Sequence, residues 1–232
     1  MAEISQPIGP VLDELRRSSR PTLVLRPAPA TRPDSVALLS GSFDPLTVGH
    51  AEMARAAAEL ADLVVLVYSV RTLPKEGSSA PALLDEGDRV LGLERFCTTH
   101  GYTAGFCSHG LLAEQIEAAD ERFPGAGLSV VIGSDKLLQL FDPRWYDDVD
   151  RVLDALFDRA SVWFATRAGD EAAVRDALRM PGHARWAARV RQLHMPANVA
   201  AVASRDVRDR IARGEDVSDL VPEEFRGLLR TR

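Results

Sequence analysis

From Ser35 onward, short continuous apolar runs alternate with longer segments in which apolar residues recur at helical spacing. The longest apolar run, Leu63 to Tyr68, has the length of a strand. Continuous apolar strands are typical of a parallel sheet that helices cover on both faces. Their alternation with helices predicts right-handed crossovers between parallel strands. The sequence therefore predicts an α/β fold with a doubly wound parallel sheet, in which ligands bind beyond the carboxyl ends of the strands.

The expected elements of this sheet follow one another regularly. We expect strands at 35–40, 62–68, 102–107, 127–132, 161–166 and 189–194. We expect helices at 48–61, 83–99, 110–121, 148–158, 171–179 and 205–213, and a last one near 222–229.

Residues 1–34 differ from the rest and are expected to form an N-terminal arm before a domain at 35–232. The spacing of Ile8, Val11, Leu12 and Leu15 predicts a short helix, and 23–25 is compatible with an extra strand between prolines. Two interpretations remain open: an arm that packs on the domain or links it to a partner, and a partly ordered tail.

Charge and cysteine content exclude several classes of protein. The 232 residues carry 34 acidic and 28 basic side chains, a net charge of -6, which argues against a nucleic-acid partner. No apolar segment approaches the length of a membrane span, so no membrane partner is expected. Cys97 and Cys107 do not make a disulfide framework and indicate reduced thiols in a cytoplasmic protein.

The segment Gly41–His50 links the first expected strand of this domain to its first helix. It contains a turn with glycine, and His50 falls in the first turn of the expected helix. The N–H groups and the dipole at a helix start favour an anion. A histidine in that turn can point at the same anion, so the segment predicts a phosphate site.

Gly-Ser-Phe-Asp-Pro followed by Thr-Val-Gly-His resembles the first signature of the adenylyltransferase/cytidylyltransferase superfamily, (His or Thr)-x-Gly-His. The resemblance implies a Rossmann-like fold in which His50 hydrogen-bonds the α-phosphate of a nucleoside triphosphate. Thr47 would contact the same phosphates, and Asp44 would cap the helix or hold the loop. The residues implied to lie at ATP here are Gly41, Ser42, Phe43 and Gly49.

A second segment, 202–208, also reads as a loop that enters a helix, with Ser204 expected as the N-cap. It resembles the superfamily's second signature, Ile-Ser-Ser-Thr-x-x-Arg, whose hydroxyls and arginine hold the β- and γ-phosphates. Arg208 matches the arginine and Ser204 the second serine. Ala203 and Arg205 depart from the pattern, so a hydroxyl is lost and a positive charge is gained. Arg205 either serves the phosphates or weakens nucleotide binding.

A third segment points to the acceptor. Gly133-Ser134-Asp135 followed by Trp145 resembles the nicotinamide and nicotinate mononucleotide adenylyltransferases. That resemblance implies that Gly133 and Asp135 lie at the nucleotide and that Trp145 or Tyr146 stacks on the pyridine ring.

Two basic residues complete the expected acceptor site. Lys75 matches loosely a lysine that relatives carry after the second strand of the domain. Arg89 falls where relatives have an arginine at the opening of a helix. Both positions are also compatible with solvated surface residues.

The resemblance implies transfer of AMP from ATP to nicotinamide or nicotinate mononucleotide, with Mg²⁺ arriving with the ATP and no metal ligands from the protein. Three alternatives remain: pantetheine-phosphate as acceptor, a nucleotide-binding regulator without turnover, and an ATPase of the same fold. The superfamily ranges from monomers to large rings, so a homo-oligomer is compatible with the sequence. No P-loop and no zinc spacing occur.

Overall fold

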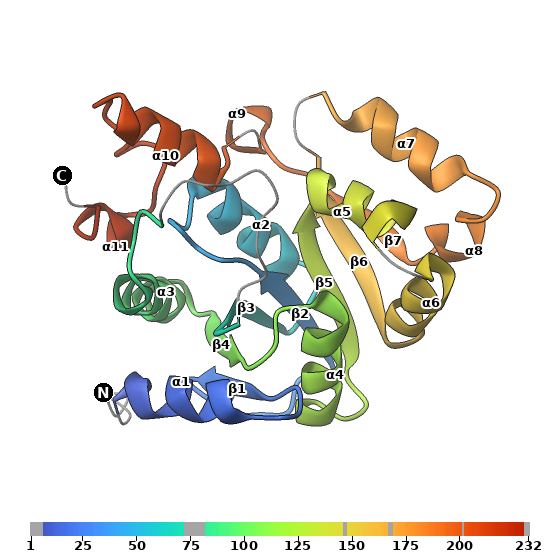
Figure 1. Ribbon diagram of the computed structural model, residues 1–232, viewed down its shortest axis with the longest axis horizontal. Coiled ribbons are helices and arrows are strands. Elements are labelled where there is room, and N and C mark those ends of the chain that lie inside the picture. Colours follow the sequence, from blue (N-terminus) through green and yellow to red (C-terminus); the bar gives the residue numbers. More distant parts are fainter. Residues whose placement is uncertain (1–6, 72–81, 146–147, 167–168, 201, 230–232) are drawn as a thin grey trace.

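A seven-stranded sheet runs through the middle of the computed structural model, which describes residues 7–71, 82–145, 148–166, 169–200 and 202–229 (Figure 1). The strand order is β1-β4-β3-β2-β5-β6-β7. The strands are β1 (Leu23–Arg26), β2 (Ser35–Ser40), β3 (Leu63–Ser69), β4 (Thr103–Cys107), β5 (Gly127–Gly133), β6 (Ala160–Ala165) and β7 (Val190–Leu193).

Neighbouring strands from β4 to β7 are parallel, and β1 alone among the described strands is antiparallel to its neighbour, β4. The register of the central strand β2 places Ala37 opposite Val64 of β3 and Ser129 of β5. The chain order reverses between β2 and β5, which is the point where doubly wound sheets bind ligands. The expected doubly wound α/β fold is confirmed.

Helices cover both faces of this sheet (Figure 1). Successive residues of a strand point to opposite faces, so Ala37 and Leu39 of β2 pack beneath α2, α3 and α11. Val36 and Leu38 face α4 and α6 on the other side. The helices are α1 (Ile8–Arg17), α2 (Val48–Ala58), α3 (Glu86–His100), α4 (Leu112–Arg122), α5 (Ser134–Leu140), α6 (Val149–Arg159), α7 (Glu171–Arg179), α8 (Ala184–Ala187), α9 (Ala197–Ala200), α10 (Ser204–Ala212) and α11 (Glu223–Arg226).

The helix starts follow from local side-chain chemistry. The Thr47 side chain caps α2, whose alanine-rich sequence favours a helix and buries Met53, Ala54 and Ala57 against the sheet. The Asp85 carboxylate caps α3 by accepting from the backbone N–H of Asp88. Both caps lie at the carboxyl edge of the sheet, so they fix the helix starts beside the expected ligand site.

The N-terminal segment packs onto the sheet. Leu12 and Leu15 of α1 are buried in the same core as α2 and α3, and β1 extends the sheet at its edge. The Arg26 guanidinium of β1 pairs with Glu94 of α3 at 2.7 Å. Residues 8–26 are therefore part of the folded body, while the expected domain boundary at residue 34 stays a prediction.

Several elements were not expected from the sequence. The expected strands occur within one or two residues of their positions, but α5, α8, α9 and the 3-10 turn Pro143–Trp145 are not among the expected helices. Each of these elements is seven residues or shorter, too short to display a helical period. Among the described residues, no helix has the length and apolar character needed to span a bilayer.

Candidate active site

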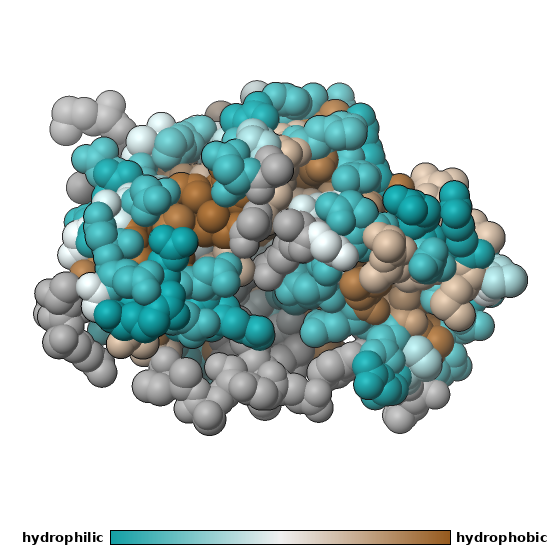
Figure 2. Space-filling view, turned by 90° about the horizontal axis from the view of Figure 1, so that it is seen from above, coloured by the Kyte–Doolittle hydropathy of each residue, from teal (hydrophilic) through white to brown (hydrophobic). Residues whose placement is uncertain are grey.

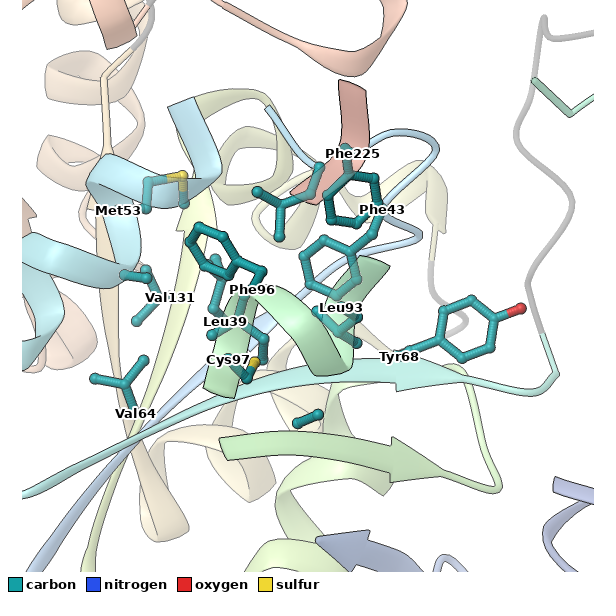
Figure 3. Close-up of a cluster of buried hydrophobic side chains, with 14 of the residues drawn as sticks. Leu39, Phe43, Met53, Val64, Tyr68, Leu93, Phe96, Cys97, Val131 and Phe225 are labelled. Carbon is teal, nitrogen blue, oxygen red and sulfur yellow. The ribbon is translucent and has the colours of Figure 1, made fainter. Parts of the chain in front are cut away.

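The loop between β2 and α2 starts where the central strand ends. Gly41 continues the sheet by donating its N–H to the carbonyl of Val67 at 3.1 Å. A Cβ at Gly41 would lie 2.7 Å from the Phe43 ring, and Phe43 itself has a positive φ of 46°. The Phe43 ring is 1% exposed and packs edge-on against the His50 ring. Figure 3 shows this ring in the core next to Phe225. Phe43 therefore fixes one side of the His50 ring by packing against it.

The His50 ring is oriented by the residue that caps its helix. The backbone N–H of Thr47 donates to His50 Nδ1 at 3.2 Å, and Thr47 Oγ1 lies 2.8 Å from the same atom. Because a backbone N–H can only donate, Nδ1 accepts, and the neutral ring carries its proton on Nε2. Thr47 is fully buried, so its Oγ1 serves as a positioning group within the protein. The arrangement presents Nε2–H as a hydrogen-bond donor at a helix start.

Asp44 holds the loop against α3. Its carboxylate accepts from the backbone N–H groups of Leu83 and Leu84, at 3.2 and 2.8 Å, and the residue is 7% exposed. Of the two roles expected for Asp44, capping the helix or holding the loop, these hydrogen bonds support holding the loop. It connects the entrance of α3 to the phosphate loop.

The C-terminal segment packs directly on this loop. Ser204 Oγ donates to the carbonyl of Pro45 at 2.9 Å, and Arg208 Nη1 donates to the carbonyl of Asp44 at 2.8 Å. Thr47 Oγ1 also lies 3.2 Å from the carbonyl oxygen of Val202. The structure thus brings together two sequence segments that lie about 155 residues apart.

The role expected for Ser204 as N-cap is wrong. The N-cap of α10 is Ala203, and the Asp206 carboxylate accepts from its N–H at 2.8 Å. The Ser204 hydroxyl is occupied across the chain at Pro45, which explains why it does not cap its own helix. Arg205 is exposed and makes no hydrogen bond or ion pair with the part of the chain that the structure describes.

Gly133 and Ser134 lie at the end of β5, beside the end of β2. Ser134 is fully buried and donates its Oγ–H to the Asp170 carboxylate at 2.6 Å. The Asp135 side chain is exposed at the first turn of α5. The first and third sequence segments therefore meet at the strand-order reversal.

The residues expected to bind the acceptor are distributed differently. Arg89 lies in the first turn of α3, with its guanidinium over the Tyr68 ring at 5.7 Å. Trp145 ends a 3-10 turn after α5, and its stacking role stays a prediction. Lys75 and Tyr146 lie outside the described residues, so their roles also stay predictions.

Some positioning groups had no signal in the sequence. The carbonyl oxygen of Val202 contacts Thr47 Oγ1, and the residue type does not determine where a carbonyl points. Asp170, the partner of Ser134, follows β6 and is not near any motif.

Figure 2 looks from above onto the side of the molecule that carries α9 and α10, where hydrophobic residues are exposed among mostly hydrophilic ones. The described residues contain no cluster of three His, Cys, Asp or Glu side chains suited to a metal ion.

We expect Arg208→Ala to loosen the loop. The Asp44 carbonyl would lose its donor, and leaving a buried acceptor unpaired costs about 1–3 kcal/mol. The melting temperature should fall by several degrees in thermal unfolding. Arg210→Ala is the matched control, because Arg210 is exposed on the same helix with only a 3.9 Å contact to Glu215. Equal melting temperatures for the two variants would contradict the role of Arg208.

Residues 38–170 match the sequence profile of the cytidylyltransferase-like family. A protein from Rubrobacter xylanophilus, named probable nicotinate-nucleotide adenylyltransferase, is 30% identical over 208 residues, which are 85% of this chain and 90% of that protein. A protein of the same name from Exiguobacterium sibiricum is 26% identical over 207 residues, 84% of this chain and 95% of its own length.

Among solved structures, Plasmodium falciparum nicotinic acid mononucleotide adenylyltransferase complexed with NaAD superposes with a TM-score of 0.57 at 13% identity. The match covers 83% of this chain and 93% of that one. A second structure of that protein, complexed with APC, gives a TM-score of 0.51 at 13% identity, over 83% of this chain and 92% of that one. At these identities the superpositions establish a shared fold.

Proposed function

Because this chain belongs to the cytidylyltransferase-like family of nucleotidyltransferases, we propose that it transfers the AMP group of ATP to a pyridine mononucleotide. The first candidate acceptor is nicotinate mononucleotide, the substrate class in the names of its curated relatives. The nicotinamide compound is the second candidate. The observation that carries the proposal is the orientation of His50 by Thr47 at the start of α2, beside the strand-order reversal.

In the proposed reaction, a phosphate oxygen of the mononucleotide attacks the α-phosphorus of ATP. A new P–O bond forms while the bond to pyrophosphate breaks, and pyrophosphate leaves in line. No covalent enzyme intermediate is needed, so catalysis consists of positioning the reactants and neutralising charge. His50 Nε2–H would donate to the α-phosphate as negative charge increases there.

The rest of the loop would hold the triphosphate. The N–H groups at the start of α2, beyond Gly41 and Ser42, favour an anion through the helix dipole. Gly49 allows close approach of the chain at this start, and Gly133 and Asp135 lie at the end of the neighbouring strand. Arg205 would reach the departing pyrophosphate, since its exposed guanidinium has no partner among the described residues.

In this proposal Arg208 keeps the phosphate role that its motif implies and also holds the loop. Its Nη1 donates to the backbone of the loop, and its remaining N–H groups are the ones available to phosphate oxygens. Mg²⁺ would enter as part of MgATP, held through phosphates and water.

The test is pyrophosphate release from MgATP with three separate acceptors: nicotinate mononucleotide, nicotinamide mononucleotide and 4′-phosphopantetheine. We expect release with a pyridine mononucleotide and little without an acceptor. Release only with 4′-phosphopantetheine would move the assignment to that acceptor. ATP binding without release would favour a regulator, for which the substitutions at Ala203 and Arg205 are the motivating observation.

A further inference from the structure

The C-terminal end of helix α1 contacts two places: the residue that follows β3 and the first turn of α3. Arg71, which follows β3, donates through Nη2 to the backbone carbonyls of Arg16 and Ser18, each at 2.7 Å. On the other side, the Arg16 guanidinium forms an ion pair with Glu86 in the first turn of α3. The end of α1 is therefore fixed at the carboxyl edge of the sheet, at the first turn of α3.

Glu86 is surrounded by cationic and donor groups. Besides Arg16, it accepts from the Tyr68 hydroxyl at 3.2 Å. Burial raises the pKa of Tyr68, so the phenol stays protonated and can donate. Figure 3 shows the Tyr68 ring at the edge of the hydrophobic cluster with its hydroxyl directed away from it. The Arg89 guanidinium lies over the same ring.

Glu86 and Arg89 are three residues apart on α3, a spacing at which side chains of opposite charge pair on a helix surface. In the structure they do not form a salt bridge: Glu86 pairs with Arg16, and Arg89 donates to the Asp85 carbonyl at 3.3 Å. Asp13 is the second carboxylate on Arg16, at 2.8 Å. Arg16 thus occupies the carboxylate that lies three residues before Arg89 on α3.

We propose that Arg16 is a positioning residue that keeps the charge of Arg89 available to an anionic acceptor by occupying Glu86. This inference rests on the proposed function, because it assumes that Arg89 contacts the phosphate of the acceptor mononucleotide. Asp44 connects the entrance of α3 to the phosphate loop, so a charge at the start of α3 lies on the ligand side of the sheet. The N-terminal segment would then contribute to acceptor affinity without touching the substrate.

The experiment measures KM and kcat for the mononucleotide and for ATP in Arg16→Ala, Glu86→Gln and the double variant. Removal of the Arg16 side chain leaves its backbone carbonyl to accept from Arg71, so the packing of α1 is retained. We expect KM for the acceptor to rise about three- to fivefold in Arg16→Ala, with KM for ATP unchanged. In the double variant, Glu86→Gln should restore the KM for the acceptor, because a neutral amide no longer competes for Arg89.

Arg17→Ala is the matched control, since Arg17 is the exposed neighbour on the same helix with no hydrogen bond or ion pair to described residues. If Arg16 had a purely structural role, Glu86→Gln would not restore the KM for the acceptor in the double variant. That outcome would overturn the inference. An unchanged acceptor KM in Arg16→Ala would do the same while leaving the proposed function intact. Absence of pyrophosphate release by the unaltered protein with every mononucleotide would overturn the proposed function and this inference with it.

Discussion

Replacing His50 by alanine is expected to lower kcat for pyrophosphate release by about 10²- to 10³-fold, the usual effect of removing one pre-organised donor to a developing negative charge. The ring is supported by the Phe43 side chain and oriented by the Thr47 N–H, so its Nε2 donor is in place before substrate arrives. KM for ATP should change little, because the donor contributes mainly in the transition state. Steady-state kinetics of pyrophosphate release measure both constants.

His194→Ala is the control for this variant. His194 is exposed, makes no hydrogen bond or ion pair to the described residues, and follows the edge strand β7. Its loss should leave kcat within about twofold, as for surface substitutions in general. A His50→Ala protein that keeps a third or more of the unaltered kcat would contradict the catalytic role of His50.

The methyl group that Gly49→Ala adds is expected to destabilise the protein, because it has no room at this position. A Cβ at Gly49 would lie 2.5 Å from the carbonyl oxygen of Val202 and 3.2 Å from that of Val199. Both are backbone atoms, so α2 and the segment before α10 would have to separate. Overpacking of this kind costs about 1–3 kcal/mol. For a chain of this size, we expect the melting temperature to fall by about 3–10 °C.

Activity should fall together with stability in this variant, because the same separation breaks the contact between Thr47 and Val202. Gly87→Ala is the matched control. It also lies in the first turn of a helix, but its nearest neighbour would be Asp85 Oδ1 at an ordinary 3.4 Å. Alanine favours a helix, so that variant should be as stable as the unaltered protein or slightly more stable. A Gly49→Ala protein of unchanged melting temperature would contradict the packing described here.

The strands and the first motif could be predicted because their signals are local. The apolar runs at β2, β3 and β5 are buried on both faces, and this leaves a plain pattern in the residues. The Thr47–His50 pair could be placed at a helix start because both residues belong to one turn. The parallel, doubly wound sheet could be predicted from the alternation of strands and helices.

Other parts of the site depend on contacts between distant segments. The sequence suggested that Ser204 caps α10, but its hydroxyl is satisfied by the Pro45 carbonyl, far away in the chain. Similarly, Arg208 matched a phosphate-binding motif, and its Nη1 donates to the carbonyl of Asp44, far away in the chain. The pairing of Arg16 with Glu86 joins the N-terminal segment to α3, and residue spacing carries no information on such a pair.

Adenylyl transfer to a pyridine mononucleotide can be tested by following the phosphorus atoms of ATP. The protein would be incubated with Mg²⁺, nicotinate mononucleotide and ATP labelled at either the α- or the γ-phosphorus. We expect the α-label to appear in a dinucleotide and the γ-label in pyrophosphate. Appearance of the γ-label in inorganic phosphate or in the acceptor, with no α-label in a dinucleotide, would contradict it.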